Sequence, residues 1–200
     1  MEFLSPDSRL MRGLSDLVDA IWINVLMLIT CIPIITIGAA LTAAQVASRR
    51  SLQGQGKVTV NYFRAFKKNF FQSTLLWFVF GPLLAVLVAS WIFLQITPLL
   101  IPKFGLSIVW LVAFDWVWPL QARFTNSVGR TLLNSLVFGF AYLGETAAMV
   151  LIDVVYFGLV AASWFFMPQG LILLLILGFG VITMLHVPLT EKVFVKYVQA

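Results

Sequence analysis

The chain has 200 residues, of which 61% are hydrophobic and only 10% are Asp, Glu, Lys or Arg, and its mean hydropathy is +0.99. Soluble domains carry about 25% charged residues, so this composition cannot cover a water-facing surface. The formal net charge is +5, and most cations stand beside apolar stretches, which indicates contact with membrane lipids rather than nucleic acid. The sequence therefore predicts an all-α, polytopic integral membrane helical bundle in a single domain over residues 1–200.

Residues 1–16 are polar, and an apolar stretch then runs over about 17–47. A helix of that length would measure about 45 Å, against a hydrocarbon core of about 30 Å. Pro33 lacks an amide proton and disfavours helix in the residue before it. We therefore expect a broken hairpin over 17–49, with helices at about 17–32 and 38–49, that either crosses the membrane or re-enters. The residues expected to shape its bend are Asn24, Pro33, Thr36 and Gly38.

A cleaved signal peptide is the alternative for this N-terminal region, because Arg9 and Arg12 precede an apolar run that ends in small residues. The leading segment contains several acidic residues, and the apolar run is long and interrupted by Asn24 and a proline. These features favour a retained hairpin, with both chain termini on the cytoplasmic side.

Small residues recur at four-residue spacing after the bend, at Ala39, Ala43 and Ala47. Helices with such a face approach each other closely in lipid, where packing drives association. We expect this face to pack within the chain, and a docking face for another membrane protein is the alternative.

Residues 50–73 form a polar segment with a loop followed by aromatic residues and cations at helical spacing. An aromatic face opposite a basic face is typical of a helix that lies in the membrane interface. The alternative is the cytoplasmic start of the next span. The residues of this predicted interfacial helix are Phe63, Arg64, Phe66, Lys67, Lys68 and Phe70.

Residues 74–190 are predicted to hold four membrane helices, and residues 191–200 a cytoplasmic tail. The apolar stretches lie at about 74–96, 105–122, 132–163 and 170–189. The third is too long for one span, so we expect a short helix before the span proper. With the hairpin this gives about six membrane-embedded helices. If residues 50–73 are cytoplasmic, alternation puts nearly all cations on that side and leaves Lys103 on the far side.

Three acidic residues lie in apolar stretches: Asp115, Glu145 and Asp153. Charge at bilayer depth costs about 2.5–3.5 kcal/mol on insertion scales, so each acid needs a partner, a cavity or a proton. One interpretation is a polar pathway or an intersubunit contact. The other places Glu145 at a helix junction near the interface and pairs Asp115 with a cation. His186 is predicted to be an interfacial or core histidine rather than a proton relay.

Motifs for catalysis are missing from the sequence. It contains no phosphate-binding Gly-rich loop followed by Lys and Ser or Thr, no His-Glu-x-x-His pair and no Gly-x-Ser-x-Gly elbow. A single histidine and a single cysteine cannot build a zinc site of the usual kind. We therefore expect no enzyme activity, no cofactor and no metal.

Four features resemble the YesL family of bacterial membrane proteins: an early Asn24, PIITIGAALTAA from Pro33, FRAFKKNFFQS from Phe63, and PLQARFTNS from Pro119. They stand in the family's order over about the first two thirds of the chain. The family-motif residues of the last block are Arg123, Phe124 and Asn126. In many members the next residue after Arg-Phe is acidic, whereas this chain has Thr125.

The resemblance implies an accessory role, because the family is classed as a domain of unknown function and its genes tend to lie beside carbohydrate importers of the ABC type. We expect a non-enzymatic protein of the bacterial plasma membrane that contacts ABC permease subunits and supports sugar uptake. The residues themselves leave an alternative, a small independent channel or carrier for a polar solute or ion, because a broken helix and interior acids can form a solute site. A lipid-dependent scaffold acting through Arg64, Lys67 and Lys68 is a third hypothesis.

Overall fold

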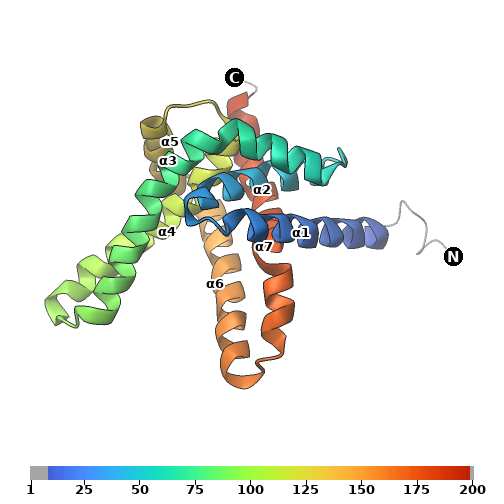
Figure 1. Cartoon of the computed structure of the whole chain (residues 1–200). Coiled ribbons are helices and arrows are strands. Elements are labelled where there is room, and N and C mark those ends of the chain that lie inside the picture. Colours follow the sequence, from blue (N-terminus) through green and yellow to red (C-terminus); the bar gives the residue numbers. More distant parts are fainter. Residues whose placement is uncertain (1–8, 199–200) are drawn as a thin grey trace.

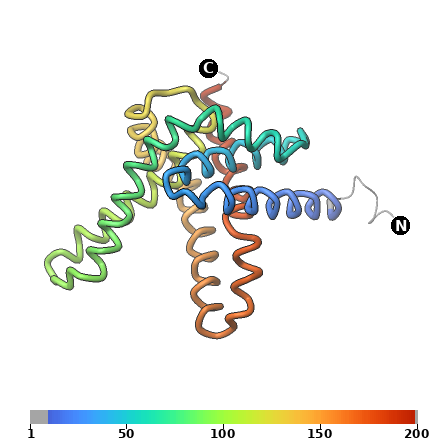
Figure 2. Tube along the Cα trace, viewed as in Figure 1, coloured from blue at the N-terminus to red at the C-terminus, as the bar shows by residue number. Residues whose placement is uncertain are grey.

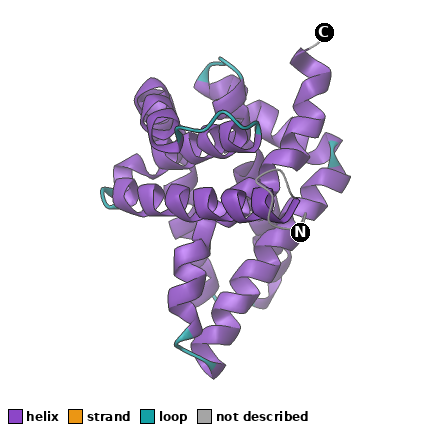
Figure 3. Cartoon of the chain, turned by 90° about the vertical axis from the view of Figure 1, so that its right-hand side faces the viewer, coloured by secondary structure: helices purple, strands orange, loops and turns teal. Residues whose placement is uncertain are grey.

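A computed structural model of the chain describes residues 9–198 and shows helices joined by short connections (Figure 1, Figure 3). The polar segment predicted at 1–16 and the tail at 191–200 therefore lie partly outside the described residues. The α-helices of this region are α1 (Arg9–Cys31), α2 (Ile37–Leu52), α3 (Val58–Phe93), α4 (Leu100–Arg123), α5 (Val128–Ala141), α6 (Leu143–Phe166) and α7 (Gly170–Val198). The all-α prediction is confirmed.

The N-terminal apolar stretch folds as two helices with a short 3-10 turn, Ile34–Thr36, between them, as predicted. The Thr36 hydroxyl donates to the carbonyls of Thr30 and Pro33, which supplies partners that the last turn of a helix lacks. A Cβ on Gly38 would lie 2.2 Å from the Ser73 carbonyl oxygen, so glycine is what lets the start of α2 touch α3.

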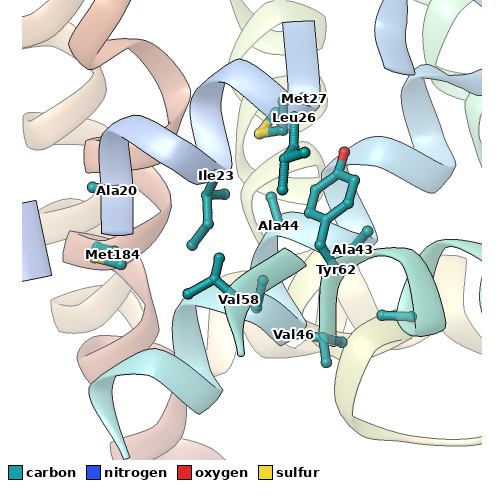
Figure 4. Packing of buried hydrophobic residues seen from close by; sticks show 12 residues of the cluster. Ala20, Ile23, Leu26, Met27, Ala43, Ala44, Val46, Val58, Tyr62 and Met184 are labelled. Atoms are coloured by element: carbon teal, nitrogen blue, oxygen red, sulfur yellow. The ribbon is translucent and has the colours of Figure 1, made fainter. Parts of the chain in front are cut away.

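Helices α1 and α2 and the first part of α3 pack into one unit, which we call the platform (residues 9–52 and 58–73). Its core contains Ile23 from α1, Ala44 from α2 and Tyr62 from α3, together with Met184 from α7 (Figure 4). The Tyr62 hydroxyl lies 2.7 Å from the Thr30 hydroxyl oxygen, which joins α3 to α1 by a hydrogen bond. The predicted packing face is fully buried in this unit at Ala39, Ala43 and Ala47. That face is therefore covered by the chain itself.

Two hairpins extend from the platform and diverge from each other (Figure 1, Figure 2). One is the second part of α3 with α4, joined by a 3-10 turn at Thr97–Leu99, and the other is α6 with α7. Among the described residues, no Cα atom of α3 lies within 8 Å of α6 or α7. In the most apolar 18-residue stretches of α3 and α6, only 11% of the residues are buried inside the molecule. Such surfaces suit a lipid environment.

Of the two interpretations of residues 50–73, the structure shows the start of the next span, because the predicted interfacial helix and that span form one continuous helix over Val58–Phe93. It changes direction between its first part, which belongs to the platform, and its second part, which belongs to a hairpin (Figure 2). The third apolar stretch, in contrast, divides as predicted into the short α5 and the longer α6.

Five helices of the described region are long and apolar enough to cross a membrane, so the chain is a multi-pass helical membrane protein. They are Leu10–Cys31, Val58–Phe93, Thr97–Arg123, Leu143–Phe166 and Gly170–Val198. Helix α2, predicted as membrane-embedded, has 16 residues and is not among them. Helix α1 runs crosswise to the α6–α7 hairpin in Figure 1, whereas the hairpin helices run along each other.

Lys103, the cation that the sequence places on the far side of the membrane from nearly all others, lies near the tip of the α3–α4 hairpin and is buried. Its ammonium group donates to the carbonyls of Ser90, at 2.7 Å, and of Leu94, both at the end of α3. It also lies 5.6 Å from the centre of the Trp91 ring. A cation at a helix C-terminus is favourable, so Lys103 caps α3.

Candidate functional site

Cations from three helices surround one cavity of about 120 Å³, which we call the cationic pocket. Helix α2 contributes two of them, the platform part of α3 two, and the end of α4 one. These residues are Arg49, Arg50, Arg64, Lys68 and Arg123. Among the described residues, no acidic side chain lines the cavity, so this wall carries a concentrated positive charge.

Two of the arginines are held by one carboxylate of α7. Arg49 Nη1 and Arg123 Nε each lie 3.6 Å from Glu191 Oε1. Burial lowers the pKa of Arg49, and the nearby Arg123 lowers it further, whereas the charge of Glu191 raises it. Arginine stays protonated in proteins, so these opposing influences leave two guanidinium charges around a single acid.

Arg50 is oriented by a second contact. Its Nη1 atom donates to Asn61 Oδ1 at 2.7 Å, and Asn61 Nδ2 donates in turn to the Gly56 carbonyl at 2.8 Å. Arg64 and Lys68 are exposed and form no ion pair within the described part of the chain. The pocket therefore has an inner wall of arginines held by contacts with the chain. Two long, exposed side chains, Arg64 and Lys68, lie at its edge.

Polar residues connect α3 and α4 beneath the cations. Gln121, which is buried, donates to Gln72 Oε1 at 3.1 Å, and Gln72 donates to the Asn126 carbonyl. Phe124 lines the cavity, and its ring centre lies 5.2 Å from that of Phe194. Of the three predicted family-motif residues, Arg123 and Phe124 thus line this pocket, whereas Asn126 lies outside its wall and accepts a hydrogen bond from Gln72 through its backbone carbonyl.

The predicted interfacial helix is divided by the structure. Arg64 and Lys68 face the cationic pocket, and Lys67 is exposed outside it. Phe66 packs against the platform core, whereas Phe63 and Phe70 are exposed. Sequence reasoning grouped the three cations by their shared helix face and did not link them with Arg49, Arg50 or Arg123.

Three ionisable side chains meet where α4, α6 and α7 pack together. The side chains of Asp115 on α4 and Asp153 on α6 lie close to each other. His186 Nε2 lies 3.4 Å from Asp153 Oδ1, and all three residues are buried. Within the described residues, Asp115 forms no ion pair with the cation expected as its partner. Glu145 lies apart at the start of α6, where its Oε1 is 3.0 Å from Lys192 Nζ.

Asn24, predicted at the bend, instead contacts α7. Helix α7 is interrupted at Gly178, whose φ of 37° lies in the left-handed region. Such an interruption frees carbonyls of the preceding turn, and Asn24 Nδ2 donates to two of them, Leu175 O at 2.7 Å and Ile176 O at 2.9 Å. The Gly-Phe-Gly run at 178–180 is the sequence signal that marks this break.

Comparison with known proteins gives one match: a family model described as "Protein of unknown function, DUF624" covers residues 20–91. No curated protein and no solved structure matches the chain. The matched region includes four of the five pocket cations, from Arg49 to Lys68, and the bend between α1 and α2. Over residues 20–91, from the platform into the first hairpin, the chain is thus similar to a family of unknown function.

Proposed function

We propose that the protein is a non-enzymatic accessory membrane protein of a carbohydrate ABC-type importer, and that it supports sugar or oligosaccharide uptake by contact with permease subunits. The observation that carries this proposal is the pair of divergent apolar hairpins on one platform. The YesL resemblance supports the choice of an importer as the partner. The choice of an importer rests on analogy with a family. The hairpins provide the surface on which a permease subunit would pack.

The hairpin surfaces support contact with another membrane protein. Large apolar side chains are exposed on both, for example Val86 on α3, with 66% exposed, and Leu151 on α6, with 63% exposed. Transmembrane helices associate by van der Waals packing. A partner helix that touches both hairpins would therefore make more persistent contacts with them than individual lipid tails do.

The proposed orientation places the platform at the cytoplasmic face of the bacterial plasma membrane. Pocket cations lie at the platform end of the hairpins, and the two hairpin tips lie away from the platform and apart from each other (Figure 1). Loops that remain in the cytoplasm are enriched in Lys and Arg. Both termini are then cytoplasmic, and Lys103 is used as a helix cap on the opposite side.

A photo-crosslinking pull-down tests the accessory function. A photoreactive amino acid is placed at Val86 or Leu151, and the tagged protein is recovered in mild detergent from its host grown on an inducing glycan. We expect permease subunits in stoichiometric amount, with crosslinks from both hairpins. A crosslinker at Lys67, on the platform, is the matched control. Recovery of the protein alone, at normal yield and in induced cells, would refute the accessory function.

The Asp115, Asp153 and His186 cluster favours a second candidate, an independent carrier for a polar solute or ion. Ionisable groups inside a membrane domain commonly mark ion or proton pathways. Purified protein in liposomes should then show solute flux without any ATPase, and Asp115→Asn with Asp153→Asn should abolish it. Absence of flux in the unmodified protein would exclude this candidate.

A further inference from the structure

The cationic pocket contains donors that the chain itself does not satisfy. Arg49 Nε and Arg123 Nε are buried and have no hydrogen-bond partner within the described residues. The contacts of Arg49 Nη1 and Arg123 Nε with Glu191 are 3.6 Å long, whereas charge-assisted hydrogen bonds measure about 2.7–2.9 Å. Buried polar groups are nearly always hydrogen-bonded, so these donors call for an acceptor from outside the chain.

The charge balance points the same way. Five cations border one cavity of about 120 Å³, and one carboxylate lies beside them. Like charges that share a small site repel each other, and the repulsion is stronger in a partly buried site than in water. An anion in the cavity would remove this repulsion and would accept hydrogen bonds from the orphaned guanidinium groups.

We propose that the cationic pocket binds a phosphate group. A carboxylate offers two oxygens in one plane, which a single arginine can satisfy in a bidentate pair. The pocket instead presents cations from three helices around a cavity, an arrangement that suits an anion with oxygens pointing in several directions. Arginine forks and lysine ammonium groups are the common phosphate ligands of proteins.

The surroundings of the cations favour binding without large rearrangement. Asn61 orients Arg50, and Glu191 lies between Arg49 and Arg123, so three guanidinium groups are positioned in advance. Exposed Arg64 and Lys68 stand at the edge of the cavity and are able to close over a ligand. The phosphate belongs either to an anionic lipid headgroup or to a soluble phosphate compound. The site is separate from the hairpin surfaces that carry the proposed function.

Two binding measurements on the purified full-length protein test this proposal and separate the two sources. In a neutral detergent, inorganic phosphate is titrated and followed by calorimetry. In parallel, native mass spectrometry counts the phosphatidylglycerol molecules retained from vesicles that contain phosphatidylglycerol and phosphatidylcholine. The pocket variant is Arg64→Gln with Lys68→Gln, and the charge-matched control is Lys67→Gln with Arg130→Gln, two exposed cations outside the cavity.

We expect saturable binding that weakens about tenfold or more in the pocket variant and stays unchanged in the control, because one lost charge-assisted hydrogen bond already accounts for such a factor. Binding of inorganic phosphate by the unmodified protein identifies a soluble ligand. If inorganic phosphate does not bind and the pocket variant, unlike the control, retains less phosphatidylglycerol, the ligand is a lipid headgroup. Thr125→Glu, which places a carboxylate in the cavity wall without removing any cation, should abolish either kind of binding. Equal effects of pocket and control variants, or no saturable binding of either probe, would overturn the proposal.

Discussion

Gly180→Ala is expected to destabilise the protein strongly, because α7 touches α1 at this residue. A Cβ at this position would lie 2.0 Å from the Ala20 carbonyl oxygen and 2.9 Å from Asn24 Cβ. The first of these atoms is backbone in the middle of α1, so it moves only if the whole helix shifts. We expect a loss at the upper end of the about 1–3 kcal/mol that overpacking costs, seen as a fall in the thermal unfolding midpoint in detergent.

Gly158→Ala is the matched control for this prediction. Gly158 lies within α6, and a Cβ added there meets nothing within 4 Å. Because alanine is favoured over glycine inside a helix by about 0.5–1 kcal/mol, this variant should unfold at the same or a higher temperature. Equal midpoints for the two alanine variants would contradict the close packing of α1 on α7.

Asn24→Leu is expected to have the second large effect, because it removes the partners of two backbone carbonyls at the break in α7. The side chain is itself buried and donates to Leu175 O and Ile176 O through hydrogen bonds that are partly buried. A buried acceptor left unsatisfied costs about 1–3 kcal/mol, so the variant should unfold at a lower temperature and exchange the amides around Gly178 faster. Thermal unfolding and hydrogen exchange of the detergent-solubilised protein measure both effects.

The same substitution at Asn134 controls for the change in size and polarity. Asn134 lies on α5, is only partly buried and forms no hydrogen bond within the described part of the chain. Asn134→Leu should therefore change the free energy of unfolding by no more than about 0.5 kcal/mol and leave the midpoint nearly unchanged, as expected for a substitution away from any buried network. If both leucine variants behave alike, Asn24 does not stabilise the break in α7.

Local signals explain which parts of the fold could be predicted. The broken N-terminal hairpin was predictable because the apolar stretch is too long for one span and because Pro33, near its middle, disfavours helix in the residue before it. The continuity of α3 was left open between two interpretations, because the change from polar to apolar residues near Ser73 resembles a boundary although nothing there stops a helix. The predicted role of Asn24 at the bend was replaced by a contact with α7, about 150 residues further along the chain.

The two polar clusters depend on tertiary structure for the same reason. Arg50 and Arg123 face one cavity although 73 positions separate them, and no periodicity links them. Asp115, Asp153 and His186 each occur on a different helix, so the sequence offered three separate polar residues in apolar stretches. The sequence showed that burying each acid in a bilayer costs free energy. This cost indicated that each acid needs a partner, but it did not identify which residue the partner is.

The orientation of the platform and its two hairpins is tested most directly by labelling single cysteines from one side of the membrane. In a Cys31→Ser background, Gln95→Cys and Gln169→Cys mark the hairpin tips, and Gln53→Cys marks the platform; all three positions are exposed. With a membrane-impermeant maleimide on intact spheroplasts, both tips should be labelled at once and Gln53→Cys only after permeabilisation. Labelling of one tip but not the other, or of Gln53→Cys in intact spheroplasts, would contradict two hairpins that cross the membrane from one cytoplasmic platform.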